Sequence, residues 1–142
     1  MKLPLKAHHL PVRLATGAFI LNSGWDKRDA DQDTAQGLHG MAAGAYPFLD
    51  KVAPADFVKA LSTAEMALGA ALLLPIVPSR LAGAGLTAFA AGLLGVYLRT
   101  PGLHHEGSVR PTPDGIGMAK DSFLLGAGLT LLLDRPHRVG RD

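Results

Sequence analysis

Long apolar stretches alternate with short polar segments along this chain. Charged side chains are absent from residues 14–25, 66–79, 81–98 and 122–133. Within 81–98, large apolar residues fall on every side of a helix, so the polar stripe expected at the surface of a soluble bundle is missing. A helix that crosses a membrane needs about 20 mostly apolar residues. We therefore predict membrane spans over residues 10–26, 57–77, 80–98 and 118–133.

These spans predict an all-α fold, an integral membrane four-helix bundle that forms one domain over residues 1–142. The alternative is a water-soluble helical bundle. A chain of 142 residues can hardly enclose three helices that are apolar all round, because each would need neighbours on every side. The pattern therefore favours the bilayer as the solvent of these helices.

The longest connection between the predicted spans, residues 26–56, contains a shorter apolar pattern. Its apolar side chains follow one another mostly at intervals of three or four positions, which is typical of one face of a helix. They are Leu38, Met41, Ala45, Phe48 and Leu49. This spacing predicts a short amphipathic segment that lies on the membrane surface. Pro47 and Pro54 divide it into shorter pieces.

The two ends of the first span carry side chains suited to a membrane interface. Arg13 can extend its guanidinium to the interface, and Trp25 is typical of an interfacial anchor at the other end. Lys and Arg are equally frequent on the two predicted sides of the membrane, but around the first span the N-terminal side carries more of them. Basic residues favour the cytoplasmic side, so we expect both termini in the cytoplasm.

Composition narrows the classes of function. The chain has no cysteine, which excludes disulfides, thiol nucleophiles and thiolate metal ligands. Its basic residues are scattered, so no nucleic-acid partner is expected. Phosphate-binding loops, dinucleotide fingerprints and nucleophile elbows are missing from the sequence. We therefore predict no catalytic residues, and independent enzymatic activity is unsupported.

Glu65 is the sharpest single feature of the sequence. It lies about 12 Å into the second predicted span, where an ionisable group costs about 2.5–3.5 kcal/mol. Arg13, Lys27 and Lys120 are its candidate partners, and Asp121 adjoins the last of them. Together these five side chains form a predicted intramembrane charge network. Glu65 then either serves proton or ligand chemistry or belongs to a buried ion pair that fixes helix packing.

Lys120 and Asp121 open the last span and allow two interpretations. In the functional one they stand at the entrance of a small-molecule pocket shared with Asn22, Trp25 and Tyr97. In the structural one they are ordinary residues of a membrane interface, with the lysine extending to water.

In a chain without cysteine, histidines and carboxylates are the candidate metal ligands. His39, His104, His105 and Glu106 all lie in predicted connections on one side of the membrane. Adjacent histidines point in different directions on a helix or a strand, and the spacing matches no zinc motif. We therefore predict no metal ligands.

Small residues recur at four-residue intervals in the last two spans. They are Ala84, Ala88 and Gly92, and then Ser122, Gly126 and Thr130. This spacing lets helix backbones approach closely. Packing within the bundle and docking against a larger partner are both consistent with it.

Several short motifs resemble the DoxX-like family of small four-span bacterial membrane proteins. The first is RLATG at 13–17, followed by GWDK at 24–27. The second is AEMALG at 64–69, similar to the family's second-span Glu followed by Gly. The third is AKDSFLLG at 119–126, similar to the start of its last span. The resemblance implies a multi-pass protein of the bacterial plasma membrane.

The family's namesakes are linked to quinone-dependent thiosulphate oxidation and to thiol-stress complexes. The resemblance therefore implies an accessory subunit of a larger respiratory or redox complex, with another membrane protein or a second copy as partner. One alternative is a quinone- or lipid-binding redox component, which makes a quinone the one cofactor to consider. Another is a small-solute transporter that acts as an oligomer.

Overall fold

The computed structural model describes residues 5–134, and its regular structure is helical. In chain order the elements are η1 (Ala7–His9), α1 (Leu10–Lys27), α2 (Gln32–Ala45), η2 (Pro47–Lys51), α3 (Pro54–Leu73), α4 (Ser79–Arg99), α5 (Ile116–Ala119) and α6 (Asp121–Leu133). Within the described range, strand-like pairing is limited to one isolated bridge between His104 and Pro111. The predicted all-α fold is therefore confirmed.

The helix boundaries follow the sequence closely where no proline intervenes. α1 and α4 begin and end within one residue of the predicted spans. α3 begins earlier than predicted because Pro54 suits a first helical turn. It ends at Leu73 rather than at residue 77, because the residue before Pro75 is kept out of the helical conformation. The fourth predicted span is divided at Lys120 into α5 and α6.

Two helical segments of residues 5–134 are long and apolar enough to cross a membrane, Ser79–Arg99 and Ile116–Leu133. α1 and α3 do not meet this criterion, since each carries three charged side chains. The helical architecture is therefore confirmed. An integral membrane bundle of four spans stays a prediction.

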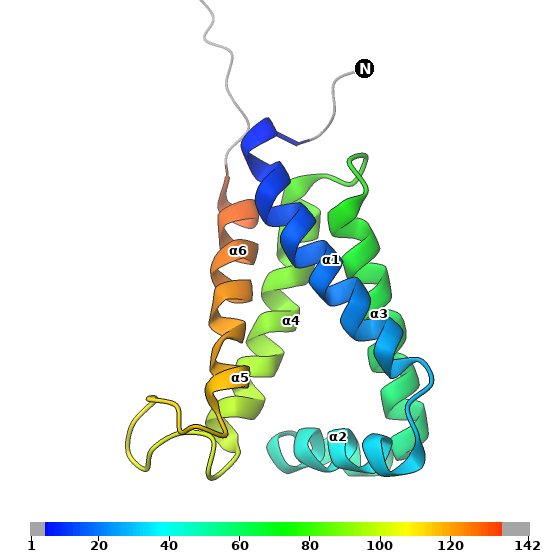
Figure 1. Cartoon of the computed structure of the whole chain (residues 1–142), viewed down its shortest axis with the longest axis vertical. Coiled ribbons are helices and arrows are strands. Elements are labelled where there is room, and N and C mark those ends of the chain that lie inside the picture. Colours follow the sequence, from blue (N-terminus) through cyan, green and yellow to red (C-terminus); the bar gives the residue numbers. More distant parts are fainter. Residues whose placement is uncertain (1–4, 135–142) are drawn as a thin grey trace, which may run out of the picture.

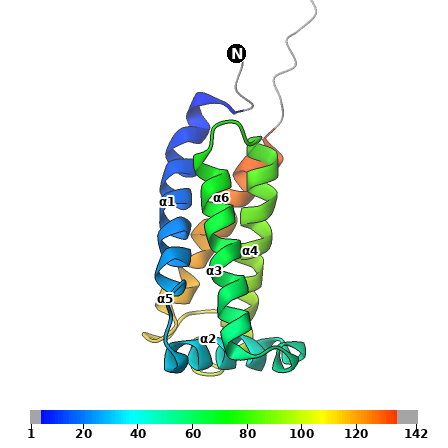
Figure 2. The ribbon, with the colours of Figure 1, turned by 90° about the vertical axis from the view of Figure 1, so that its right-hand side faces the viewer.

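The helices pack as two close pairs, α1 with α3 and α4 with α6 (Figures 1 and 2). Glycine makes both contacts close. A Cβ atom on Gly69 of α3 would lie 2.6 Å from the backbone nitrogen of Leu21 in α1. One on Gly128 of α6 would lie 2.7 Å from the backbone nitrogen of Thr87 in α4. Any side chain at either position would force the backbones apart.

The small-residue intervals predicted from the sequence lie off these close contacts. Gly92 and Gly126 each face open space rather than a neighbouring backbone. Packing within the α4–α6 pair instead runs through Gly83 and Gly128, which belong to neither predicted series. A four-residue repeat marks one helix face, but a helix with small residues on several sides offers several such faces.

The two pairs meet at one end of the molecule and separate toward the other, where α2 runs crosswise (Figure 1). The joined end contains the core, whose most buried side chains include Ile20, Leu72, Leu86 and Leu131. At the opposite end α2 contacts both α3 and α4. The fold therefore has a packed end and an end bridged by α2.

Arg13 organises the packed end. Its side chain is only 1% exposed, although it carries a full positive charge. Its guanidinium donates hydrogen bonds to the carbonyl oxygens of Ala71 (2.8 Å), Leu72 (2.8 Å), Leu74 (2.9 Å) and Val77 (2.8 Å), and to Ser79 Oγ (3.1 Å). The last carbonyls of a helix lack partners within it, and their partial negative charge favours a cation. The Arg13 side chain is therefore buried inside the protein, where the end of α3 offers it acceptors.

We expect Arg13→Lys to lower the free energy of unfolding by about 2–4 kcal/mol, since hydrogen bonds from a charged donor contribute about 1.5–3 kcal/mol each. Lysine keeps the charge but lacks the planar set of five donors. Thermal unfolding in mild detergent measures the effect. Arg80→Lys, the same change at an exposed position beside the same turn, is the control and should unfold as wild type does. Equal unfolding temperatures for both variants would contradict this role.

The close α4–α6 contact predicts opposite effects for the same substitution two positions apart. Gly128→Ala should lower stability by about 1–3 kcal/mol, because the new methyl group meets the backbone of Thr87. Gly126→Ala should be neutral or stabilise by up to about 1 kcal/mol, since it gains helix propensity in open space. Unfolding of the two variants side by side checks this. A Gly128→Ala protein as stable as Gly126→Ala would show that the helices do not approach so closely.

Candidate functional site

Glu65 pairs with Lys27 at the bridged end of the molecule. Lys27 Nζ lies 3.1 Å from Glu65 Oε2, and the glutamate is 2% exposed. Of the three candidate partners, the structure therefore selects Lys27. Arg13 lies about 21 Å from Lys27 along α1, at 1.5 Å per residue. Lys120 is exposed.

Local packing between α1 and α3 sets the position of this ion pair. The Ser62 hydroxyl donates to the carbonyl oxygen of Gly24 at 2.7 Å, which joins the two helices one turn from the pair. Gly24 has no side chain, so α1 lies against the Cβ atom of Glu65. Lys27 also donates to Ser23 Oγ at 2.6 Å. The Lys27 ammonium thus compensates the buried charge of Glu65 and is itself held by Ser23, and a buried charge is tolerated when it is paired.

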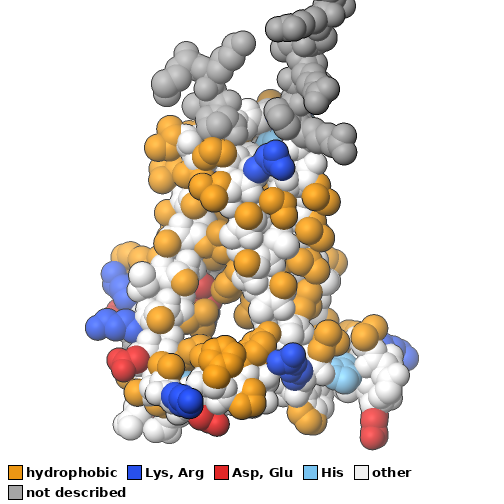
Figure 3. Space-filling model, turned by 180° about the vertical axis from the view of Figure 1, so that it is seen from behind, with side chains coloured by type: hydrophobic (Ala, Val, Ile, Leu, Met, Phe, Trp, Pro, Cys, Tyr) orange, Lys and Arg blue, Asp and Glu red, His pale blue; other side chains and the backbone are white. Residues whose placement is uncertain are grey.

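The ion pair faces a cavity of about 540 Å³ between the two helix pairs, the apolar cavity. α1, α2, α3, α4 and α6 all contribute to its wall. In Figure 3 the molecule is hollowed above α2, and hydrophobic side chains surround the hollow. Its apolar lining includes Phe19, Leu38, Phe57, Leu61, Phe89 and Leu93. The charged side chains of its wall are Lys27, Glu65 and Asp121.

Asp121, the first residue of α6, differs from the other two charged groups of the wall. It is half-buried and lies within electrostatic range of both Glu65 and Lys27. Among residues 5–134, no hydrogen bond or ion pair engages its carboxylate. The apolar cavity thus contains one ion pair and one carboxylate that has no partner in the described part of the chain.

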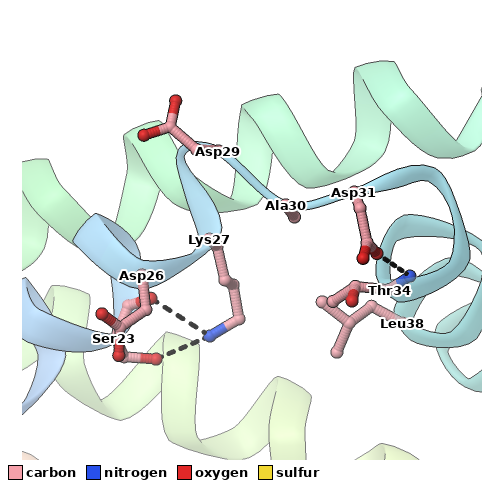
Figure 4. Close-up of a pocket in the computed structure, with 8 residues that line it drawn as sticks. All are labelled: Ser23, Asp26, Lys27, Asp29, Ala30, Asp31, Thr34 and Leu38. Atoms are coloured by element: carbon pink, nitrogen blue, oxygen red, sulfur yellow. Dashed lines mark hydrogen bonds between the residues drawn. The ribbon is translucent and has the colours of Figure 1, made fainter.

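A second, polar hollow of about 470 Å³ adjoins the apolar cavity at the α1–α2 turn (Figure 4). Ser23, Lys27 and Leu38 line both spaces. In Figure 4 the Lys27 side chain is directed toward Ser23. Asp31 begins α2 and accepts a hydrogen bond from the Thr34 backbone N–H at 2.7 Å, which lowers the pKa of its carboxyl. Lys27 therefore stands at the boundary between a polar and an apolar compartment.

α2 closes the apolar cavity at the bridged end. The Tyr46 hydroxyl donates to the carbonyl oxygen of Gly92 in α4 at 2.9 Å. Arg99 of α4 donates to the carbonyl oxygen of Ala45 at 3.0 Å. The apolar side chains of the predicted amphipathic segment divide between two environments. Leu38, Met41 and Leu49 line the cavity, Phe48 is exposed, and Ala45 is buried outside the cavity wall.

The structure brings together three of the five residues of the predicted charge network, Lys27, Glu65 and Asp121. The residues proposed to form a ligand pocket with Asp121 lie elsewhere. Asn22 and Trp25 are exposed on α1 and line neither space. Tyr97 is buried and donates to the carbonyl oxygen of Val109 at 2.7 Å. Sequence reasoning missed Ser23 and the cavity-facing side of α2, although Ser23 lies one helical turn before Lys27.

The histidines of the connections serve as hydrogen-bonding groups in this structure. The His39 ring bonds to the carbonyl oxygen of Leu49 at 2.8 Å. His104 contacts the carbonyl oxygens of His105 and Leu98, which favours its charged form and raises its pKa. No interaction brings His39 to the pair at 104 and 105 within the described residues.

His8, His9 and Asp134 offer ligand atoms within 4.8 Å of one another, at the packed end. The His9 ring contacts Ser79 Oγ at 2.8 Å and Asp134 Oδ2 at 2.6 Å. The Lys6 ammonium lies 2.9 Å from the same carboxylate oxygen. These contacts use the ligand atoms and place a positive charge beside them, so the group ties the end of α6 to the start of α1.

Comparison with protein-family models, with curated proteins and with solved structures finds no match for this chain.

The ion pair predicts an asymmetric mutational response. Lys27→Met leaves the buried Glu65 carboxylate unpaired and should cost about 3 kcal/mol. Glu65→Gln should cost less, because the Lys27 side chain is 21% exposed and can turn to water. Combining the two changes should restore most of the stability, as measured by thermal unfolding in detergent. Glu65→Gln combined with Lys120→Met is the control and should restore none. Recovery with Lys120→Met instead would identify a different partner.

Proposed function

We propose that this protein is a small bacterial membrane protein that binds an amphiphilic molecule between its two helix pairs. The observation that carries the proposal is the apolar cavity and its shared wall with the polar hollow at Lys27. Its volume of about 540 Å³ lies within the range of small-molecule sites, about 300–1,000 Å³. The apolar part of the ligand occupies the cavity, and its polar part lies near Lys27 and Asp121.

The disposition of charge supports four membrane spans. The buried charges of α1 and α3 have partners inside the protein, Arg13 on backbone carbonyls and Glu65 on Lys27. Ionisable residues in membrane helices usually face the protein interior in this way. Large apolar side chains meanwhile face outward from α1 and α6, with Leu14 52% and Phe123 77% exposed. Such a surface suits lipid. Both termini then lie in the cytoplasm, and the α2 end lies at the outer surface.

An amphiphile-binding role agrees with the quinone- or lipid-binding function implied by the DoxX-like resemblance. The protein's part is binding and positioning. A ligand held at the bridged end has its polar part near the membrane surface and its apolar part toward the membrane interior. Redox chemistry, where it occurs, belongs to the bound molecule and to a partner.

A role as accessory subunit is a second candidate, and one observation favours it. Ser122, Gly126 and Thr130 form a small-residue face on α6 that is exposed rather than packed inside the molecule. Such a face allows close approach of a helix from another membrane protein. The two roles are compatible, since an accessory subunit can hold the ligand of a larger complex.

Filling the apolar cavity tests the proposed function. Ala88 lines the cavity, so Ala88→Trp should displace the ligand by occupying its space. Ala91→Trp makes the same change at an exposed position of the same helix, outside the cavity. Solvent extraction and mass spectrometry of the purified proteins should find an amphiphilic molecule retained by wild type and Ala91→Trp, and at least tenfold less of it in Ala88→Trp. Equal retention in all three proteins, or none in wild type, would overturn the proposal.

A further inference from the structure

We propose that the amphiphile is a lipophilic cation, a molecule with an ammonium or similarly charged group joined to an apolar body, and that Asp121 holds its charge. This inference rests on the proposed function and specifies the chemical class of the ligand. It follows from the charges of the two spaces, from the hydrogen-bonding groups that are already occupied, and from the aromatic lining.

The charges of the wall are unbalanced. Carboxylates line the two spaces at five positions, and Lys27 is the one Lys or Arg side chain among the residues that line either space. The carboxylates belong to Asp26, Asp29, Asp31, Glu65 and Asp121. Inside the apolar cavity, Lys27 forms an ion pair with Glu65 at 3.1 Å, whereas the Asp121 carboxyl group has neither an ion pair nor a hydrogen bond within residues 5–134. A charge in apolar surroundings costs much free energy unless a counter-charge accompanies it.

Each carboxylate of the polar hollow has a partner that Asp121 lacks. Asp31 accepts from the Thr34 amide, and the carboxylate of Asp29 lies 3.6 Å from exposed Arg28. Asp26 has a long contact of 3.5 Å with Asn22. The remaining acidity of the hollow attracts cations toward the cavity, because a concave surface of one sign raises the local concentration of the opposite charge.

The hydrogen-bonding groups of the apolar cavity also favour a cationic ligand over an anionic one. Two of its side-chain donors are engaged, the Lys27 ammonium with Glu65 and Ser23, and the Tyr46 hydroxyl with the backbone of Gly92. An anionic headgroup or a neutral carbonyl would have to compete with those bonds. The Asp121 carboxyl group has no protein partner within residues 5–134, and in its ionised form it only accepts hydrogen bonds. A carboxylate without a protein partner favours a ligand that carries a hydrogen-bond donor or a positive charge.

The aromatic lining adds to this preference. Phe19, Phe57, Phe89 and Tyr46 come from four different helices or segments and all face the apolar cavity. A cation near an aromatic face is attracted by about 0.5–2 kcal/mol, and substituted ammonium ions are typical ligands of such surroundings. Leu61 and Leu93 complete a surface that accepts the apolar body.

Two ions of nearly the same shape and opposite charge test the inference. Equilibrium dialysis of the full-length protein in a non-ionic maltoside detergent measures binding of tetraphenylphosphonium, a cation, and of tetraphenylborate, an anion, after correction for protein-free micelles. We expect wild type to bind the cation at least tenfold more tightly. Asp121→Asn should lose at least tenfold of the cation affinity and none of the anion affinity. Asp33→Asn, at an exposed position of α2 outside both spaces, is the matched control and should bind as wild type does.

The outcomes separate the inference from the function on which it rests. Equal binding of both ions to wild type, abolished by Ala88→Trp, would leave the amphiphile site intact and overturn the choice of a cation. Cation binding unchanged by Asp121→Asn would overturn the role of Asp121. Binding of neither ion, or binding that Ala88→Trp does not reduce, would overturn the site itself. The comparison of the two ions on wild type decides the matter even where Asp121→Asn fails to fold.

Discussion

The guanidinium of Arg13 joins the last carbonyls of α3, the turn that follows and the first residue of α4. A buried cation must find acceptors for its donors, and the end of a helix supplies several that are otherwise unpaired. Satisfying Arg13 therefore places α1 against α3 and fixes where α4 begins. The two helix pairs are joined directly at this end, whereas at the other end α2 bridges them through Tyr46 and Arg99. The separation of the pairs, and with it the cavity, follows from that asymmetry.

The ion pair of Lys27 and Glu65 has a different consequence, because it lies at the end where the two helix pairs have separated. It neutralises a buried carboxylate and also brings polar atoms to the wall of a space that is otherwise apolar. α2 then closes the space through Tyr46 and Arg99. The result is a compartment with apolar sides and one polar boundary, which suits a molecule with the same division. The carboxyl group of Asp121 makes this polar boundary acidic.

Some of this arrangement could be predicted from residues alone. The predicted spans 10–26 and 80–98 match α1 and α4 to within one residue, because a helix that meets apolar surroundings on all sides tolerates few charges. Glu65 was identified as a group that needs a partner for the same reason. The choice among Arg13, Lys27 and Lys120 could not be made, since it depends on which ends of α1 and α3 lie together. The true close contacts of α4 and α6 were missed because Gly83 and Gly128 stand among many other small residues.

The sequence by itself determined the helical class, most helix boundaries and the need of Glu65 for a partner, because these depend on residues close together in the chain. Only the tertiary structure decided that Arg13 donates to the carbonyls at the end of α3 and that Lys27 pairs with Glu65. It also decided that Asp121 lines the same cavity as Lys27 and Glu65. A local pattern states what a side chain requires, such as burial, a counter-charge or a donor. Which distant residue meets the requirement depends on how the helices cross, and here that was decided by glycine contacts between helices and by the acceptors at the end of α3.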